Sequence, residues 1–136
     1  MKWLIFATLA LSVGAVAGEL PQHVVTYTSD AGESMDAFAV RIARDAVMKS
    51  GSGEVCGEFR DVDGRLVLET YTTRKLRECS YLRQPSDGYT GITFHTHPKS
   101  PPRFTPDDYS SPGYMATAKY VMHQQGPGTS RRVSSL

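Results

Sequence analysis

The stretch that decides the fold spans residues 93–108 and reads TFHTHPKSPPRFTPDD. It holds two of the four histidines of the chain, His95 and His97, one residue apart, and it ends on two adjacent acids. Residues 89–94 (YTGITF) predict a strand that runs directly into His95. Four prolines lie between residues 98 and 106, so we expect an irregular loop there.

The spacing of the two histidines favours a metal site. Side chains alternate between the two faces of a strand, so residues two apart at a strand end point off the same face. His95 and His97 therefore form a chelating pair. Histidine is the commonest metal ligand, but two ligands do not complete a site, and an H-x-H pair also occurs in loops that bind no metal.

Residues 105–108 (TPDD) have the pattern of a helix start. Thr105 is the expected N-cap, Pro106 occupies the first helical position, and Asp108 stands where a capping-box acid would lie. Two interpretations are open for this unit. It could supply an acidic metal ligand, or it could serve only to cap a turn.

Together these residues resemble the motif of the JAMM (MPN-type, Mov34/JAB-like) zinc metalloproteases, H-x-H-x7-S-x2-D, with Thr105 in the serine position. In that family a glutamate precedes the motif, in an early strand that follows a helix. Residues 54–57 (EVCG) are similar to the E-x-C-G of many bacterial members. The resemblance covers about residues 34–108. The chain also resembles small exported bacterial relatives, in which segments similar to residues 104–109 (FTPDDY) and 113–115 (GYM) recur.

The resemblance implies an α+β fold: a cytidine-deaminase-like layered, mixed sheet with an N-terminal helix and short C-terminal strands. It also implies a Zn²⁺ ion held by His95, His97 and Asp108, with an open fourth position as in catalytic zinc sites. Glu54 would act as the general base. The hydroxyl of Thr105 would help to hold the substrate carbonyl or its oxyanion.

Two assignments stay open at this site. Glu58 lies four residues after Glu54 on the same face of the expected strand and could be the base instead, although the E-x-C-G match favours Glu54. Asp107 could replace Asp108 as a ligand, although the motif spacing favours Asp108. After Asp108 the chain reads as short strands and lacks the closing helix of fuller family members.

The remaining segments predict a lead-in strand, one helix and a hairpin. Residues 23–27 are rich in β-formers. Apolar residues at spacings of three and four predict a helix over about residues 34–49, with Ser34 as its N-cap. Strand-like runs at 54–60 and 65–72 flank a D-G pair that favours a tight turn. Residues 73–86 carry no assignable pattern, whereas 113–118 and 119–125 read as short β-like runs before a polar tail. His23 and His123 are interpreted as ordinary strand residues.

Residues 1–17 have the three-part layout of a cleavable secretory signal: Lys2, an apolar run, and the A-x-A site at 15–17. The run is shorter than the ~20 residues that a spanning helix needs, so we expect no membrane insertion after cleavage. Residues 18–136 would then form a single JAMM-like domain. Lys2 is the only charged residue of the signal, and the chain has 15 basic and 14 acidic residues. The mature protein is therefore uncharged overall, which argues against nucleic-acid and anionic-membrane partners.

Export would indicate a role for the two cysteines, Cys56 and Cys79. An oxidising compartment favours a disulfide between them. Two other interpretations are free buried thiols and a zinc site shared with His95 and His97, although the cysteines lack the C-x2–4-C spacing that is usual for such sites.

These observations predict an exported, periplasmic or secreted zinc metallopeptidase or isopeptidase. Its substrate would be a peptide or protein of the cell envelope or outside the cell, with peptidoglycan peptides among the candidates. The alternative is a non-catalytic JAMM-like binding or assembly module with structural zinc or none. A third possibility is an inert, disulfide-stapled secreted protein that binds no metal.

Overall fold

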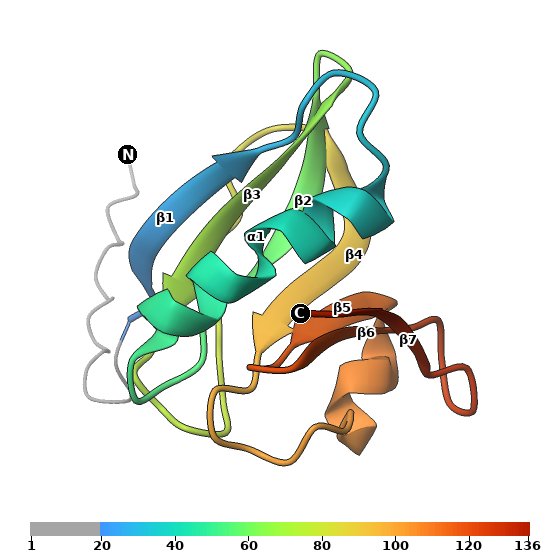
Figure 1. Ribbon diagram of the computed structural model, residues 1–136. Helices are drawn as coiled ribbons and strands as arrows, with labels where there is room; N and C mark the ends of the chain where they lie inside the picture. The colour runs from blue at the N-terminus through green and yellow to red at the C-terminus, as the bar shows by residue number, and fades with distance from the viewer. Residues whose placement is uncertain (1–19) are drawn as a thin grey trace.

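A computed structural model describes residues 20–136 and shows one α-helix on a seven-stranded mixed sheet (Figure 1). The strands are β1 (Gln22–Thr28), β2 (Cys56–Val62), β3 (Arg65–Thr72), β4 (Tyr89–Thr96), β5 (Gly113–Ala116), β6 (Tyr120–Gln124) and β7 (Arg131–Ser135). Their order in the sheet is β1-β3-β2-β4-β5-β6-β7. The expected α+β class and mixed sheet are thus confirmed, while the predicted signal peptide, residues 1–17, lies outside the described residues.

The helix α1 (Met35–Ser50) lies across one face of the sheet (Figure 1). Its N-cap is Ser34, as predicted, whose hydroxyl accepts the backbone N–H of Ala37 at 3.1 Å. The helix buries an apolar stripe at spacings of three and four residues, formed by Phe38, Ala39, Ile42, Ala43 and Ala46. This stripe forms one core with Phe59 of β2, Phe94 of β4 and Tyr114 of β5, so the helix covers the middle of the sheet, including the strand that carries the predicted motif.

Four aromatic rings fix the helix on the sheet. The ring of Phe59 in β2 meets the rings of Phe38, Phe94 and Tyr114 edge to face, with centroids 5.8, 6.2 and 5.8 Å away. These rings come from α1, β4 and β5 and are fully or almost fully buried. Such pairs add stabilisation beyond the area that they bury, so the middle strands are held in one register.

The predicted hairpin is formed by β2 and β3. Asp63 and Gly64 both adopt left-handed backbone conformations, with φ of 54° and 83°, as a two-residue turn of type I′ requires. The sequence placed Glu54 inside the first of these strands, but β2 begins only at Cys56. The reason is local: the N–H of Glu54 bonds to the carbonyl of Lys75 at 3.0 Å, in the loop after β3, and not to a neighbouring strand.

Strand β4 joins an antiparallel and a parallel part of the sheet. It pairs antiparallel with β2 and parallel with β5, which is the only parallel pair among the described strands. A parallel pair requires a crossover, and here residues 97–112 make it. This crossover contains the expected proline-rich loop and the short 3₁₀ helix η2 (Pro106–Ser110), so the predicted helix start forms a single turn.

The polar tail contains β7, a strand that the sequence did not predict. Its residues, RRVSS, lack the apolar alternation of a core strand because β7 lies at the edge of the sheet and pairs only with β6. Two arginines hold it in place. Arg131 contacts Asp36 of α1 at 3.1 Å, and the guanidinium of Arg132 lies 4.3 Å from the ring centre of Tyr120.

A disulfide joins Cys56 and Cys79, whose Cα atoms are 6.0 Å apart, which confirms the predicted staple. It ties the loop between β3 and β4, residues 73–88, to the first residue of β2. Within residues 20–136 no helix is both long and apolar enough to cross a membrane.

Candidate metal centre

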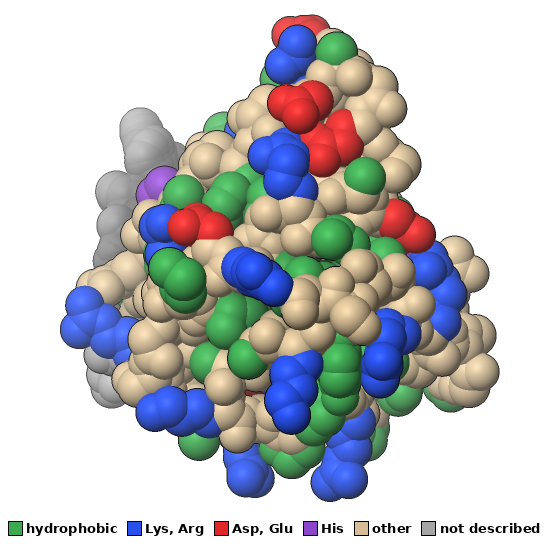
Figure 2. Space-filling model, viewed as in Figure 1, with side chains coloured by type: hydrophobic (Ala, Val, Ile, Leu, Met, Phe, Trp, Pro, Cys, Tyr) green, Lys and Arg blue, Asp and Glu red, His purple; other side chains and the backbone are tan. Residues whose placement is uncertain are grey.

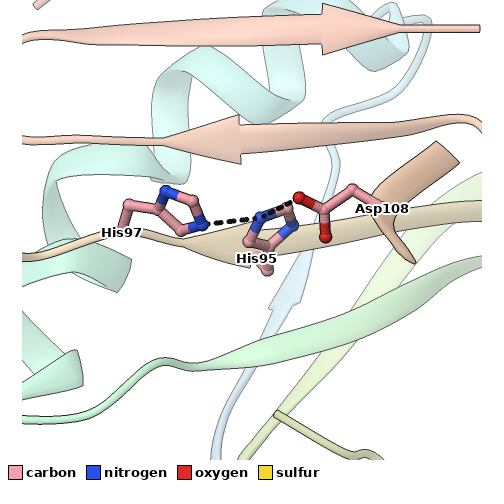
Figure 3. A group of neighbouring side chains, drawn as sticks. All are labelled: His95, His97 and Asp108. Atoms are coloured by element: carbon pink, nitrogen blue, oxygen red, sulfur yellow. Dashed lines mark hydrogen bonds and ion pairs between the residues drawn. The ribbon is translucent and has the colours of Figure 1, made fainter. Parts of the chain in front are cut away.

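Three side chains of the kinds that bind metals meet where β4 ends. His95 lies in β4, His97 follows directly after the strand, and Asp108 lies in η2 (Figure 3). The Nε2 atoms of His95 and His97 are 3.2 Å apart, and Nε2 of His95 is 3.7 Å from Oδ2 of Asp108. One ligand atom from each residue lies within 4.8 Å of the other two, so the group could hold a metal ion.

The donor set and its spacing fit zinc. Tetrahedral zinc binds histidine nitrogen at about 2.0–2.1 Å, which separates two such ligand atoms by about 3.3 Å. The two Nε2 atoms are 3.2 Å apart. A carboxylate is an accepted third ligand, and three protein ligands leave one position open, which is the pattern of catalytic zinc sites.

Hydrogen bonds set the orientation of His97. Its Nδ1 lies 2.8 Å from the carbonyl oxygen of Pro101. A carbonyl can only accept, so Nδ1 donates and Nε2 of the neutral ring keeps a free lone pair for a metal. Between the two histidines, the buried hydroxyl of Thr96 accepts the N–H of Val55 at 3.0 Å and bonds to the hydroxyl of Ser50 at 2.6 Å. This bond ties the strand end to α1.

A capped turn brings Asp108 to the histidines. The backbone N–H of Thr105 donates to Oδ2 of Asp108 at 2.7 Å, and the N–H of Asp108 donates to the carbonyl of Thr105 at 3.0 Å. The side-chain amide of Gln124 in β6 donates to the carbonyl of Asp108 at 2.9 Å. The T-x-x-D unit therefore does cap a turn, and the same carboxylate faces His95. Capping the turn therefore does not prevent Asp108 from serving as a metal ligand.

The carboxylate of Glu54 lies beside these three candidate ligands. Its Oε2 lies 3.7 Å from Nε2 of His97, and the residue is 5% exposed. Burial, together with the charge of Asp108, raises the pKa of Glu54 to about 7. Burial also lowers the pKa of His95 to about 4, against the opposing effect of Asp108, so the imidazole is in the neutral form that a metal needs.

Glu58 and Asp107 occupy different environments. The carboxylate of Glu58 accepts a bond from Arg83 at 2.7 Å and one from the N–H of Gly91 at 2.8 Å. Although burial raises the pKa of Glu58, these bonds and one from Tyr81 bring it below its usual value. Glu58 is therefore fully engaged in holding the loop after β3. Asp107 is exposed at the cleft edge and does not belong to the ligand group.

Two clefts open at this centre. The larger, about 470 Å³, is lined by His95 and by residues of the loop after β3, among them Arg77, Glu78 and Tyr81. The smaller, about 150 Å³, is lined by His97, Ser100, Pro101 and Arg103. Glu54, Arg77, Thr105 and Asp108 line both. The candidate ligands and the acid therefore lie at the junction of two clefts.

The loop residues that line these clefts were not predicted. Residues 73–86 show no periodicity, so the sequence did not place them near the site. Cys79 is the one residue whose pattern could have indicated this position. Its disulfide partner, Cys56, lies only two residues after Glu54 in the sequence, so the bond brings the loop close to Glu54.

No family model, no curated protein and no solved structure matches this chain.

Proposed function

We propose that this protein is an exported zinc metallopeptidase of the JAMM type, which hydrolyses an amide or isopeptide bond in a cell-envelope or secreted substrate. One observation carries the proposal. The buried carboxylate of Glu54 lies beside a group of three residues that could hold a metal ion, at the junction of two open clefts. A purely structural zinc site would need neither this acid nor an open ligand position.

His95, His97 and Asp108 would hold the metal. A bound zinc would act as a Lewis acid that polarises the substrate carbonyl and activates water. Glu54 would accept the proton of the attacking water and pass it to the leaving amine. A pKa near 7 suits a group that must both take and release a proton close to neutral pH.

Thr105 would help to position the substrate carbonyl. It lines both clefts, next to Glu54 and Asp108. Its backbone N–H is used by the carboxylate of Asp108, and its hydroxyl has a proton that it can donate to a substrate oxygen. The extra methyl of threonine restricts the rotation of this hydroxyl compared with serine.

Export is supported by the disulfide, because such bonds persist in oxidising compartments. A periplasmic or extracellular location favours peptide or protein substrates of those compartments, and peptidoglycan peptides are among them.

The test compares the zinc-loaded protein with Glu54→Gln on a mixture of peptides, with products identified by mass spectrometry. Glu54→Gln keeps the size of the side chain, so fold and zinc content should be unchanged while hydrolysis falls by 10² or more. Glu78→Gln, which removes the same charge from the wall of the larger cleft, is the matched control. Zinc binding without hydrolysis of any peptide would favour the alternative of a non-catalytic binding module.

A further inference from the structure

Two arginines line the smaller cleft from different loops. Arg77 comes from the loop after β3, and Arg103 comes from the crossover after β4. The loops are joined where the hydroxyl of Ser100 donates to the carbonyl of Leu76 at 3.4 Å. Both arginines are exposed. They therefore bring two positive charges to a pocket that also contains His97, Asp108 and Glu54 of the candidate metal centre.

Neither guanidinium has an acidic partner or a side-chain hydrogen bond within residues 20–136. Other cations of the same loop do. Arg83 pairs with Glu58, and Arg74 donates to the side-chain oxygen of Gln22 at 3.0 Å. The two arginines of the cleft thus keep their donors free for a ligand.

One face of the molecule is basic along its lower edge. Figure 2 shows Lys and Arg side chains along the lower part of the molecule, whereas the Asp and Glu side chains visible on this face lie in its upper half. The loops after β3 and β4 run along that lower edge (Figure 1). The overall charge of the chain is only +1, so the basic character of this region is local. Two guanidinium groups without an acidic partner among the described residues attract an anion to the cleft by long-range electrostatics, and the carboxylates of Glu54 and Asp108 in the same lining face the candidate metal position.

We propose that Arg77 and Arg103 bind a carboxylate of the substrate in the smaller cleft, which places the bond to be hydrolysed close to that carboxylate. This inference rests on the proposed peptidase function. Guanidinium groups match a carboxylate in charge and in geometry. The carboxylate can be the free C-terminus of a peptide or an Asp or Glu side chain, and the two sources are separated by experiment.

The first test measures binding and needs no turnover. The purified protein, as isolated and after zinc addition, is titrated with N-acetylglycine and with N-acetylglycinamide, and the arginine Nε–Hε signals are followed by NMR. Signals of Arg77 and Arg103, assigned through Arg77→Lys and Arg103→Lys, should shift with the acid and not with the amide. Arg77→Gln and Arg103→Gln should each weaken binding about 10- to 100-fold, the cost of a charge-assisted hydrogen bond.

The control variants are Arg74→Gln and Lys99→Gln. Arg74 lies in the same loop as Arg77, and Lys99 lies in the same loop as Arg103. Each control removes one positive charge, but neither residue lines either cleft. Affinity for the acid should therefore change by less than about twofold in the controls. An equal loss of affinity in the control and test variants would mean that only the overall positive charge of the region attracts the acid, which would overturn the proposal. Unchanged affinity in Arg77→Gln and Arg103→Gln would overturn it as well.

The second test uses turnover to identify the source of the carboxylate. Zinc-loaded protein is given peptides with free or amidated C-termini, with and without one Asp or Glu near the end. Preference for free acids identifies the C-terminus, and preference for acidic side chains in amidated peptides identifies those. Hydrolysis that is indifferent to both overturns the carboxylate pocket and leaves the peptidase standing. No hydrolysis, with Arg-dependent acid binding in the first test, overturns the peptidase and leaves the pocket standing.

Discussion

Oε2 of Glu54 and Nε2 of His97 lie 3.7 Å apart because of the pairing of β2 with β4. In this antiparallel pair Cys56 stands opposite His95. Two residues before Cys56 and two residues after His95 are Glu54 and His97, and the N–H of Thr96 bonds to the carbonyl of Val55 between them at 3.0 Å. One strand register therefore brings the acid to the candidate ligands.

A change at Asp108 should separate metal binding from capping. In Asp108→Asn the side-chain oxygen can still accept the N–H of Thr105, so the turn should persist while the charged ligand is lost. We expect zinc affinity to fall by more than the 10- to 100-fold that removal of an outer-shell partner costs. Competition with a chelating dye measures the affinity. Asp107→Asn is the control, and an equal loss in it would mean that the wrong acid has been identified.

The raised pKa of Glu54 predicts how the stability of the metal-free protein depends on pH. With an unfolded value of 4.5 and a folded value of about 7, the native state holds a proton that the unfolded chain releases. The free energy of unfolding should therefore fall between about pH 4.5 and pH 7, by up to about 3 kcal/mol from this group, and the loss is complete above pH 7.

Urea unfolding of wild type and Glu54→Gln at pH 5 and pH 8 isolates this contribution, because the other titrating groups are common to both proteins. The free energy of unfolding of Glu54→Gln, minus that of wild type, should be larger at pH 8 than at pH 5. A difference between the two proteins that does not vary with pH would show that Glu54 titrates normally.

The hydroxyl of Thr105 can be tested by two substitutions of similar size. Thr105→Val removes the hydroxyl and should lower turnover by about 10²-fold with zinc retained. Thr105→Ser keeps the hydroxyl, frees its rotation and should preserve activity. Initial rates and zinc content of the two variants are compared, and equal rates in Thr105→Val and wild type would remove this hydroxyl from the mechanism.

The disulfide should stabilise both the fold and the wall of the larger cleft. Cys56 and Cys79 are 23 residues apart in the chain. Replacement of both by alanine should lower the free energy of unfolding by about 3 kcal/mol in the chain-entropy model. Thiol labelling of the unfolded, unreduced wild type should find no free cysteine, and two labelled residues would show that the bond does not form.

Much of the candidate site could be predicted from local sequence. His95 and His97 share a strand face because side chains alternate, and the T-x-x-D unit carries its own turn. The position of Glu54 could not be predicted in this way, because it depends on which strands pair. Only the resemblance of the EVCG segment to a family motif singled it out from Glu58.

Two parts of the molecule were beyond sequence reasoning for physical reasons. The loop over residues 73–88 contains no helix or strand and is held by the disulfide and by bonds from Arg83 and Tyr81 to the carboxylate of Glu58. None of these contacts leaves a periodic pattern. Strand β7 is an edge strand whose pairing with β6 outweighs the weak β-propensity of its polar residues.

The proposed function depends on zinc binding by His95, His97 and Asp108. The most direct measurement is the metal content of the purified protein by elemental mass spectrometry, before and after zinc addition and removal of excess. His97→Ala is measured beside it, with His123→Ala, a histidine of β6 that lies outside the ligand group, as the control. We expect about one zinc per chain in wild type and in His123→Ala, and none in His97→Ala. Wild-type protein that takes up no zinc, or His97→Ala that keeps its zinc, would show that these residues do not form a zinc site.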